Sequence, residues 1–273
     1  GTFNTAVGYQ SLLANTTGTN NTALGYSSLK ENTTGISNTA FGSNSLLTNS
    51  LGNQNTGVGH NSLQLSTTAN DNTALGYSAL SSNTTGIRNT SVGSDSLSTN
   101  VIGSSNVAIG YQALKVSTIE NLTAVGFQSL LANTTGTSHV ALGYRTLASN
   151  TIGTSNTAIG YAVLSSNVTG NSNVGIGSIS LLGCNSEGNT SVGFSSLSTI
   201  TTVGLLTAVG YEALKANSAG FFNTAIGYRS LATNTTGSNN SSLGYLSLVS
   251  NTTGTSNTAV GYRSLTANTT GSD

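Results

Sequence analysis

Charged residues are scarce in this sequence of 273 residues. Seven acidic and seven basic side chains make up 5% of the chain, whereas an ordinary soluble domain contains about 25%. The formal net charge is zero, so the sequence offers no electrostatic surface for nucleic acid or for an anionic membrane. Disorder caused by charge is also excluded, because disordered segments combine low hydrophobicity with high net charge.

Several other residue types are missing. The sequence has no methionine, proline or tryptophan, and its one cysteine, Cys184, excludes a framework of intrachain disulfides. No apolar run approaches the roughly 20 residues that a membrane-spanning helix needs. Because neither a signal peptide nor an initiator methionine is present, we expect this chain to be a mature protein or a segment of a longer one.

A tandem repeat dominates the sequence. A glycine recurs in a T-A-x-G-Y element at residues 8, 25, 42, 59, 76, 93, 110, 126, 143, 160, 177, 193, 210, 227, 244 and 261. Thirteen of the fifteen intervals span seventeen residues, and the two that end at Gly126 and Gly193 are shorter by one residue. The consensus is N-T-A-φ-G-Y-x-S-L-x-x-N-T-T-G-x-x, where φ is aliphatic or Phe; we number its positions one to seventeen. Repeats of this kind indicate a solenoid.

The repeat predicts an all-β fold, a parallel β-solenoid or β-roll of sixteen coils. Gly, Asn, Thr and Ser are poor or indifferent helix formers, and a unit of this length is too short for a helical pair. The T-A-φ-G-Y stretch alternates with period two, which is typical of a strand, and its β-branched residues favour one. We expect residues 1–273 to form a single repeat array without a separate capping domain, each coil rising by ~4.8 Å.

Two columns are apolar throughout, at positions four and nine, and we expect both to face the core. Position seven accepts residues of every kind and is expected to face solvent. The predicted core columns include Val7, Leu12, Leu24, Leu29, Leu46 and Leu63.

Positions three and five carry only small residues, and we expect them to lie on the opposite face of the strand. A surface of Gly and Ala allows another backbone to approach closely. The hypothesis is that this stripe packs against other copies of the chain, forming a trimer or a filament. Its members include Ala6, Gly8, Ala23, Gly25, Ala259 and Gly261.

Asparagine fills positions one and twelve in most repeats, and two interpretations stay open. Stacked amides can donate hydrogen bonds to and accept them from their neighbours along a solenoid. Alternatively, position twelve begins an N-x-T sequon, the acceptor for N-glycosylation. The candidate glycosylation sites are Asn15, Asn32, Asn83, Asn133, Asn167, Asn234, Asn251 and Asn268.

All ten tyrosines occupy position six. Either they form a stacked aromatic edge, or they form a strip that binds sugars. They are Tyr9, Tyr26, Tyr77, Tyr111, Tyr144, Tyr161, Tyr211, Tyr228, Tyr245 and Tyr262.

Catalytic and metal-binding patterns are not found in the sequence. His60 and His139 fall in different columns, and the acidic residues are scattered, so no carboxylate pair or row of calcium ligands is expected. No phosphate-binding G-x-x-x-x-G-K-[ST] element occurs. We therefore expect no enzyme activity, no cofactor and no metal.

The N-T-A-[VIL]-G-Y-x-[SA]-L units resemble the short repeats of trimeric autotransporter adhesin heads, and also the shaft repeats of trimeric phage and viral tail fibres. The resemblance extends over the whole chain. It implies a left-handed β-roll, three chains side by side, an extracellular location or one on a cell or virion surface, and a structural role in a fibre, filament or adhesin. A host-surface or glycan receptor is the implied external partner.

An ice-binding solenoid is the alternative function. Such proteins present a regular threonine array, and a T-x-T pattern occurs at positions fourteen and sixteen, as in Thr17 and Thr19. The column is interrupted by Ile36, Asn53, Ile87 and Phe221.

Overall fold

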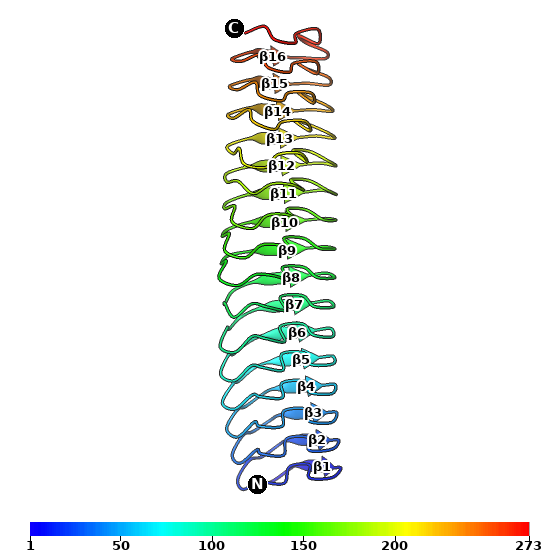
Figure 1. Cartoon of the computed structure of the whole chain (residues 1–273). Helices are drawn as coiled ribbons and strands as arrows, with labels where there is room; N and C mark the ends of the chain where they lie inside the picture. Colours follow the sequence, from blue (N-terminus) through cyan, green and yellow to red (C-terminus); the bar gives the residue numbers. More distant parts are fainter. Residues whose placement is uncertain (273) are drawn as a thin grey trace. The chain divides into compact units, whose positions relative to one another are not determined.

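The computed structural model describes residues 1–272, and these residues form strands, turns and bends but no helix. By its contacts the chain divides into two compact units, which begin at Gly1 and at Ser138. Each unit is a parallel β-solenoid with one short strand for every repeat of the sequence, which confirms the predicted fold class. Figure 1 shows the strands stacked in sequence order within each unit.

Every strand is three residues long and covers positions two to four of its repeat. The strands of the first unit are β1 (Thr5–Val7), β2 (Thr22–Leu24), β3 (Thr39–Phe41), β4 (Thr56–Val58), β5 (Thr73–Leu75), β6 (Thr90–Val92), β7 (Val107–Ile109) and β8 (Thr123–Val125). Those of the second unit are β9 (Val140–Leu142), β10 (Thr157–Ile159), β11 (Val174–Ile176), β12 (Thr190–Val192), β13 (Thr207–Val209), β14 (Thr224–Ile226), β15 (Ser241–Leu243) and β16 (Thr258–Val260). We number each coil after its strand.

Equivalent residues of successive coils pair with one another. Thr22 of β2 is in register with Thr39 of β3, for example, and the pairing is parallel. The two repeats that are one residue short keep this register, since Val107 pairs with Thr123 and Val174 pairs with Thr190. The missing residue is therefore absorbed outside the strand.

The interior of each unit is narrow, and in most coils it contains one large apolar side chain, the leucine at position nine. Leu29, Leu46 and Leu63 at position nine have no exposed surface, and Leu12 in the first coil is 9% exposed. Ala23 at position three is also fully buried. The strand thus turns its smallest side chain inward, against the leucine.

Position four points outward, so the expectation that Val7 and Leu24 belong to the core is wrong. Val7 is 55% exposed and Leu24 is 43% exposed. Successive residues of a strand point to opposite faces, and only a small residue fits between the strand and the position-nine leucine. The period-two pattern is present as predicted, but its inward and outward faces are interchanged.

The predicted small-residue stripe for packing between chains is wrong at position three for the same reason. Ala23 and Ala259 are buried inside their own coil, although Ala6 in the first coil is exposed. Position five is glycine because of the coil stacking. Gly25 has φ +137°, and a Cβ there would lie 2.6 Å from the carbonyl oxygen of Gly42 in the next coil. These glycines allow coils of the same chain to approach each other.

Two columns of buried asparagine amides fill the rest of the interior. Asn38 at position one donates through Nδ2 to Gly52 O at 2.8 Å, and its backbone N–H donates to Asn21 Oδ1 at 2.9 Å. Asn49 at position twelve donates to the same Gly52 oxygen at 3.0 Å and to Asn32 Oδ1 at 3.1 Å. Both columns therefore converge on the position-fifteen carbonyl and connect each coil to its neighbour.

Positions twelve and fifteen change together along the chain. Twelve coils combine Asn with Gly, and the four coils without Asn also lack Gly: Ser66 with Ala69, Ser117 with Ile119, Cys184 with Ser186, and Ile200 with Val203. Part of the reason is steric, because a Cβ on Gly86 would lie 2.4 Å from Asn83 Oδ1, in addition to 2.3 Å from the carbonyl oxygen of Gly103 in the next coil. A side chain at position fifteen therefore requires a different residue from Asn at position twelve.

This coupling predicts the outcome of a double-mutant cycle. We expect Gly86→Ala to lower the free energy of unfolding by about 1–3 kcal/mol through steric overlap. Asn83→Ser alone removes the donor to Gly86 O and the acceptor for Asn100 Nδ2. The double variant should lose less than the sum of the two single variants, with a coupling on the order of 1 kcal/mol. Urea unfolding monitored by circular dichroism measures all three; additive losses would contradict the steric explanation.

Candidate interaction face

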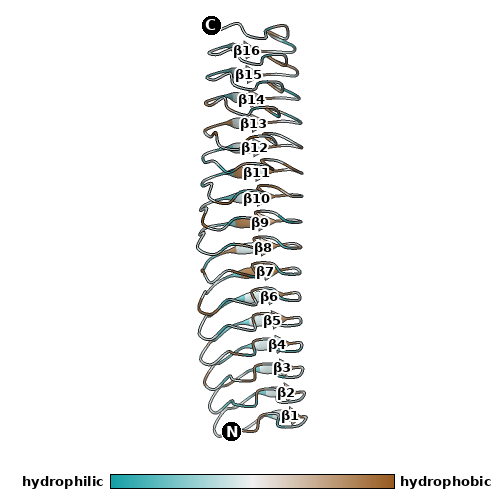
Figure 2. Cartoon of the chain, in the orientation of Figure 1, coloured by the Kyte–Doolittle hydropathy of each residue, from teal (hydrophilic) through white to brown (hydrophobic). Residues whose placement is uncertain are grey.

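The outward side of the strands carries a threonine column beside an aliphatic column. Position two is Thr in twelve coils and Val in three, and the described side chains there are half-buried or exposed. Position four is aliphatic or Phe in all sixteen coils. Figure 2 shows the effect of the three valines at position two: β7, β9 and β11, which begin with Val, are the most hydrophobic strands.

The aliphatic column is more exposed than a solenoid core residue and is continuous within each unit. Leu75 is 47% exposed, Ile109 38% and Leu243 47%, although each has neighbours of the same kind in the adjacent coils. Side chains of such size are usually buried. This column is the candidate functional feature that the sequence pattern alone assigns to the wrong side of the strand. The sequence does contain one signal for the correct side. Position three is restricted to Ala, Gly or Ser, and only small residues fit on the inward side of a narrow coil.

An aromatic column runs along position six, next to the aliphatic one. The rings stack on those of the neighbouring coils, with centroids 5.2 Å apart for Tyr9 and Tyr26 and 4.9 Å apart for Tyr144 and Tyr161. The interplanar angles of these pairs are 17° and 6°. The tyrosine side chains are nevertheless exposed, by 40–74%. We call the columns at positions two, four and six together the outer face.

Few charges lie near the outer face. Glu212 at position seven forms an ion pair with Lys215 Nζ at 2.7 Å and another with Arg229 Nε at 3.3 Å. The carboxylate is therefore compensated by two cations of its own chain. The outer face is apolar and hydroxyl-bearing rather than charged, which suits a neutral, apolar partner surface.

The candidate glycosylation sites lie mostly in the interior. The amides of Asn32, Asn83, Asn133, Asn167, Asn234 and Asn251 are fully buried, which contradicts their selection as glycan carriers in the folded chain. They donate their amide hydrogens within the column, as Asn251 does to Asn234 Oδ1 at 3.0 Å. Asn15 and Asn268 in the terminal coils are half-buried, and each donates to the position-fifteen carbonyl of its own coil. The position-twelve asparagines therefore act as structural amides.

Two titratable residues replace asparagine in these columns. His139 is 1% exposed, receives the backbone N–H of Asn156 at Nδ1 (3.2 Å) and donates from Nε2 to Gly153 O (2.7 Å). Burial lowers the pKa of this imidazole, and two backbone hydrogen bonds partly oppose the shift. Burial likewise raises the pKa of the Cys184 thiol, against the opposing effect of hydrogen bonds with Ser186 and Asn189. Neutral His139 therefore replaces an amide in the column.

Residues 1–272 contain no group of three or more His, Cys, Asp or Glu side chains that could hold a metal ion. Within the same residues, no helix has the length and apolar character to cross a membrane.

No protein-family model, curated protein or solved structure matches this chain. The resemblance to adhesin heads and tail-fibre shafts therefore stays a prediction.

We expect His139 to make the stability of the second unit depend on pH. Because its folded-state pKa is lowered, the unfolded chain binds the proton more readily, and stability should fall as the pH drops below the ordinary histidine pKa of about 6.5. His139→Asn restores the repeat consensus and should reduce the loss of Tm between pH 7.5 and pH 5, by roughly 3 °C for each kcal/mol involved. Calorimetry of both proteins at the two pH values tests this. Equal losses of Tm would show that another group controls the acid sensitivity.

Proposed function

We propose that this chain is a structural repeat segment, a shaft of an extracellular fibre, filament or adhesin, whose copies associate side by side through the outer face. The observation that carries the proposal is the apolar column at position four, which is exposed or half-buried in every coil. The low charge and the unbroken repeat also favour a structural role. The resemblance to fibre repeats supports a location outside the cell or on a virion.

The exposed apolar area is of the size that a stable interface needs. In the second unit, seven aromatic side chains at position six are exposed by 40–74%: Tyr144, Tyr161, Phe194, Tyr211, Tyr228, Tyr245 and Tyr262. At about 200 Å² for each ring residue, they present roughly 700 Å², to which the adjoining aliphatic column adds. A standard interface buries about 800 Å² per partner, and the largest apolar patch on a monomer is about 300–600 Å².

A second copy of this chain is the partner that fits best. The apolar groups of the outer face recur once per coil, at a rise of ~4.8 Å. A partner that contacts them over many coils must present groups at the same spacing, and a globular surface does not. Another copy does, and a cyclic arrangement of copies closes the interface. Interchain packing through the outer face thus replaces packing through the small-residue stripe.

The outer face can be tested with isoleucine-to-threonine substitutions, which keep the β-branched shape that suits a strand. The test variant carries Ile159→Thr, Ile176→Thr and Ile226→Thr at position four. By sedimentation velocity, we expect the parent chain to associate and this variant to shift toward the single-chain mass of 27.3 kDa. The association constant should fall at least tenfold, because apolar contact is lost in three coils.

The matched control makes the same three changes elsewhere on the surface. Ile36, Ile102 and Ile152 lie at positions sixteen and fourteen and are 43%, 64% and 54% exposed. Their replacement by Thr should leave the association unchanged. A parent chain that sediments as a single copy at all concentrations would overturn side-by-side association, as would a control variant that dissociates as readily as the test variant.

An ice-binding solenoid is the second candidate, favoured by the threonine column at position two. Five consecutive coils present Thr22, Thr39, Thr56, Thr73 and Thr90 in one register on the outward side. This column is more regular than the T-x-T pattern at positions fourteen and sixteen. It also competes with self-association, because both uses need the outer face free.

Thermal hysteresis distinguishes the two candidates. For a fibre shaft we expect no freezing-point depression beyond the colligative value, both for the parent and for the dissociated Ile→Thr variant. Clear hysteresis that disappears in Thr56→Tyr, which places a bulky ring within the threonine column, would establish ice binding instead.

A further inference from the structure

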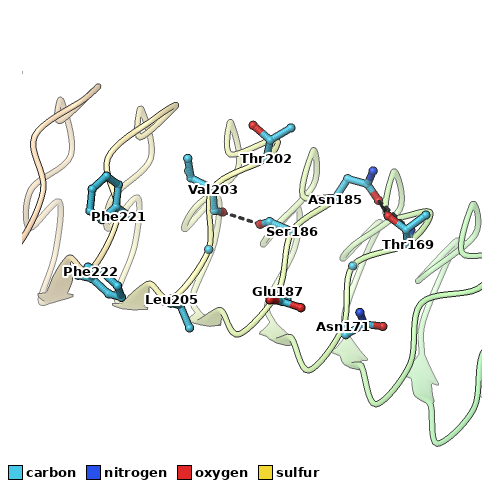
Figure 3. Close-up of a pocket in the computed structure, with 12 residues that line it drawn as sticks. Thr169, Asn171, Asn185, Ser186, Glu187, Thr202, Val203, Leu205, Phe221 and Phe222 are labelled. Carbon is cyan, nitrogen blue, oxygen red and sulfur yellow. Dashed lines mark hydrogen bonds between the residues drawn. The ribbon is translucent and has the colours of Figure 1, made fainter.

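A shallow groove of about 570 Å³ opens at the corner of the second unit, away from the strands. Coils 10 to 13 line it with residues from positions thirteen to seventeen. Figure 3 shows two rows of side chains along these coils, one containing Asn171, Glu187, Leu205 and Phe222, the other Thr169, Asn185, Thr202 and Phe221. The groove therefore presents a different residue in each coil, unlike the outer face.

The amide column breaks at this groove. Cys184 and Ile200 replace position-twelve asparagines in two successive coils, and Asn167 Oδ1, which would face the next amide, is buried without a hydrogen-bond partner. Ser186 and Val203 replace the position-fifteen glycines, and the repeat of coil 11 is one residue short. Ser66 and Ser117 also replace this asparagine in single coils, and Asn49 Oδ1 beside Ser66 is likewise unpaired. Coils 11 and 12 differ in that two successive coils depart from the consensus, again at the cost of a buried unpaired oxygen.

Large apolar residues occupy an unfavourable backbone conformation beside the groove. Position seventeen has positive φ in every described coil, and Ser, Asn, Asp or Gly suits that conformation best. Here it is occupied by Leu205 (φ 62°) and Phe222 (φ 56°), which are 55% and 53% exposed. Phe221 beside them is 47% exposed and contacts Phe222 edge to face, with centroids 5.3 Å apart. Core packing does not explain these side chains, because they are exposed.

Polar groups with free hydrogen-bonding capacity lie along the same groove. Asn171 Oδ1 accepts a hydrogen bond from the backbone N–H of Thr154. Asn185 Oδ1 accepts hydrogen bonds from the backbone N–H groups of residues 168 and 169. Their Nδ2 groups have no acceptor among the described residues. Glu187 is exposed and has no ion pair there. The groove thus offers two amide donors and a carboxylate acceptor next to two aromatic rings.

We propose that this groove is a binding site for a neutral oligosaccharide. The C–H face of a pyranose carries a weak positive potential that suits the negative face of Phe222 or Phe221. Sugar hydroxyl groups both donate and accept hydrogen bonds. They can therefore accept from the Nδ2 groups of Asn171 and Asn185 and donate to the carboxylate of Glu187. A pyranose ring is about as long as the ~4.8 Å rise of one coil, so consecutive rings follow consecutive coils.

The charge of the groove selects against other ligand classes. None of the twelve residues that line it is Lys or Arg, and Glu187 contributes a negative charge. A phosphate or carboxylate ligand finds no cation there and is repelled. A metal ion finds only one carboxylate. This site lies off the outer face, so the inference does not depend on how copies of the chain associate.

The test is a printed array of neutral oligosaccharides, followed by titration calorimetry with the strongest binder. We expect saccharide binding by the parent chain. Phe222→Asn should weaken it at least tenfold through loss of the stacking ring, and Glu187→Gln should weaken it to a smaller extent. Phe222→Asn installs the residue that Asn239 provides at position seventeen of the next coil, so folding is preserved. The thermal melt of each variant checks this.

Two substitutions at equivalent positions in the first unit serve as controls. Phe3→Asn removes an exposed Phe at position seventeen with φ 59°, and Glu120→Gln changes the position-sixteen acid of the other short repeat. Neither should affect binding. The proposal is overturned if no neutral saccharide on the array binds, or if folded Phe222→Asn and Glu187→Gln bind as tightly as the parent. Equal losses in the two controls would also overturn it.

Discussion

The convergence of two buried amides on one backbone carbonyl is the interaction on which each unit depends. In coil 2, Gly35 O accepts Nδ2 of Asn21 at 2.8 Å and Nδ2 of Asn32 at 3.1 Å. A coil with a single leucine inside buries too little apolar surface to close around it, and unpaired backbone groups in the interior would be costly. The asparagine columns satisfy those groups and also connect neighbouring coils. Glycine at position fifteen follows from this, because both amides need room beside the carbonyl.

The same narrow interior determines what the outside presents. Since the amide columns and the leucine fill the cross-section, the inward strand position accepts only Ala, Gly or Ser, and the large aliphatic residue must point outward. The outer face is therefore a consequence of how the coil is filled. That origin explains its regularity, because each coil repeats the same kind of interior and so turns an apolar residue outward at the same position. A protein built in this way presents a long apolar surface that self-association can bury.

Much of this architecture could be predicted from the sequence, and the errors share one cause. The period of the repeat and the β-favouring residues were sufficient for a parallel solenoid, and the invariant leucine marked an interior column. The period alone does not show which of the two faces of the strand points into the coil. An apolar residue at position four and a small one at position three are compatible with either orientation. The choice depends on the coil width, which is set by Asn21, Asn32 and their equivalents on the far side of the coil.

The groove of the second unit was beyond sequence reasoning for a related reason. Cys184, Glu187 and Leu205 each look like an isolated substitution when the repeats are aligned. An isolated substitution does not show which way its side chain points or which other residues it lies beside. Stacking places them within adjacent coils, and the positive φ at position seventeen shows that Leu205 and Phe222 occupy sites that favour small polar residues. In a strictly periodic fold, the regular columns are explained by packing. Residues that are exposed, unfavourable for the backbone and clustered in adjacent coils need another explanation, and ligand binding provides one.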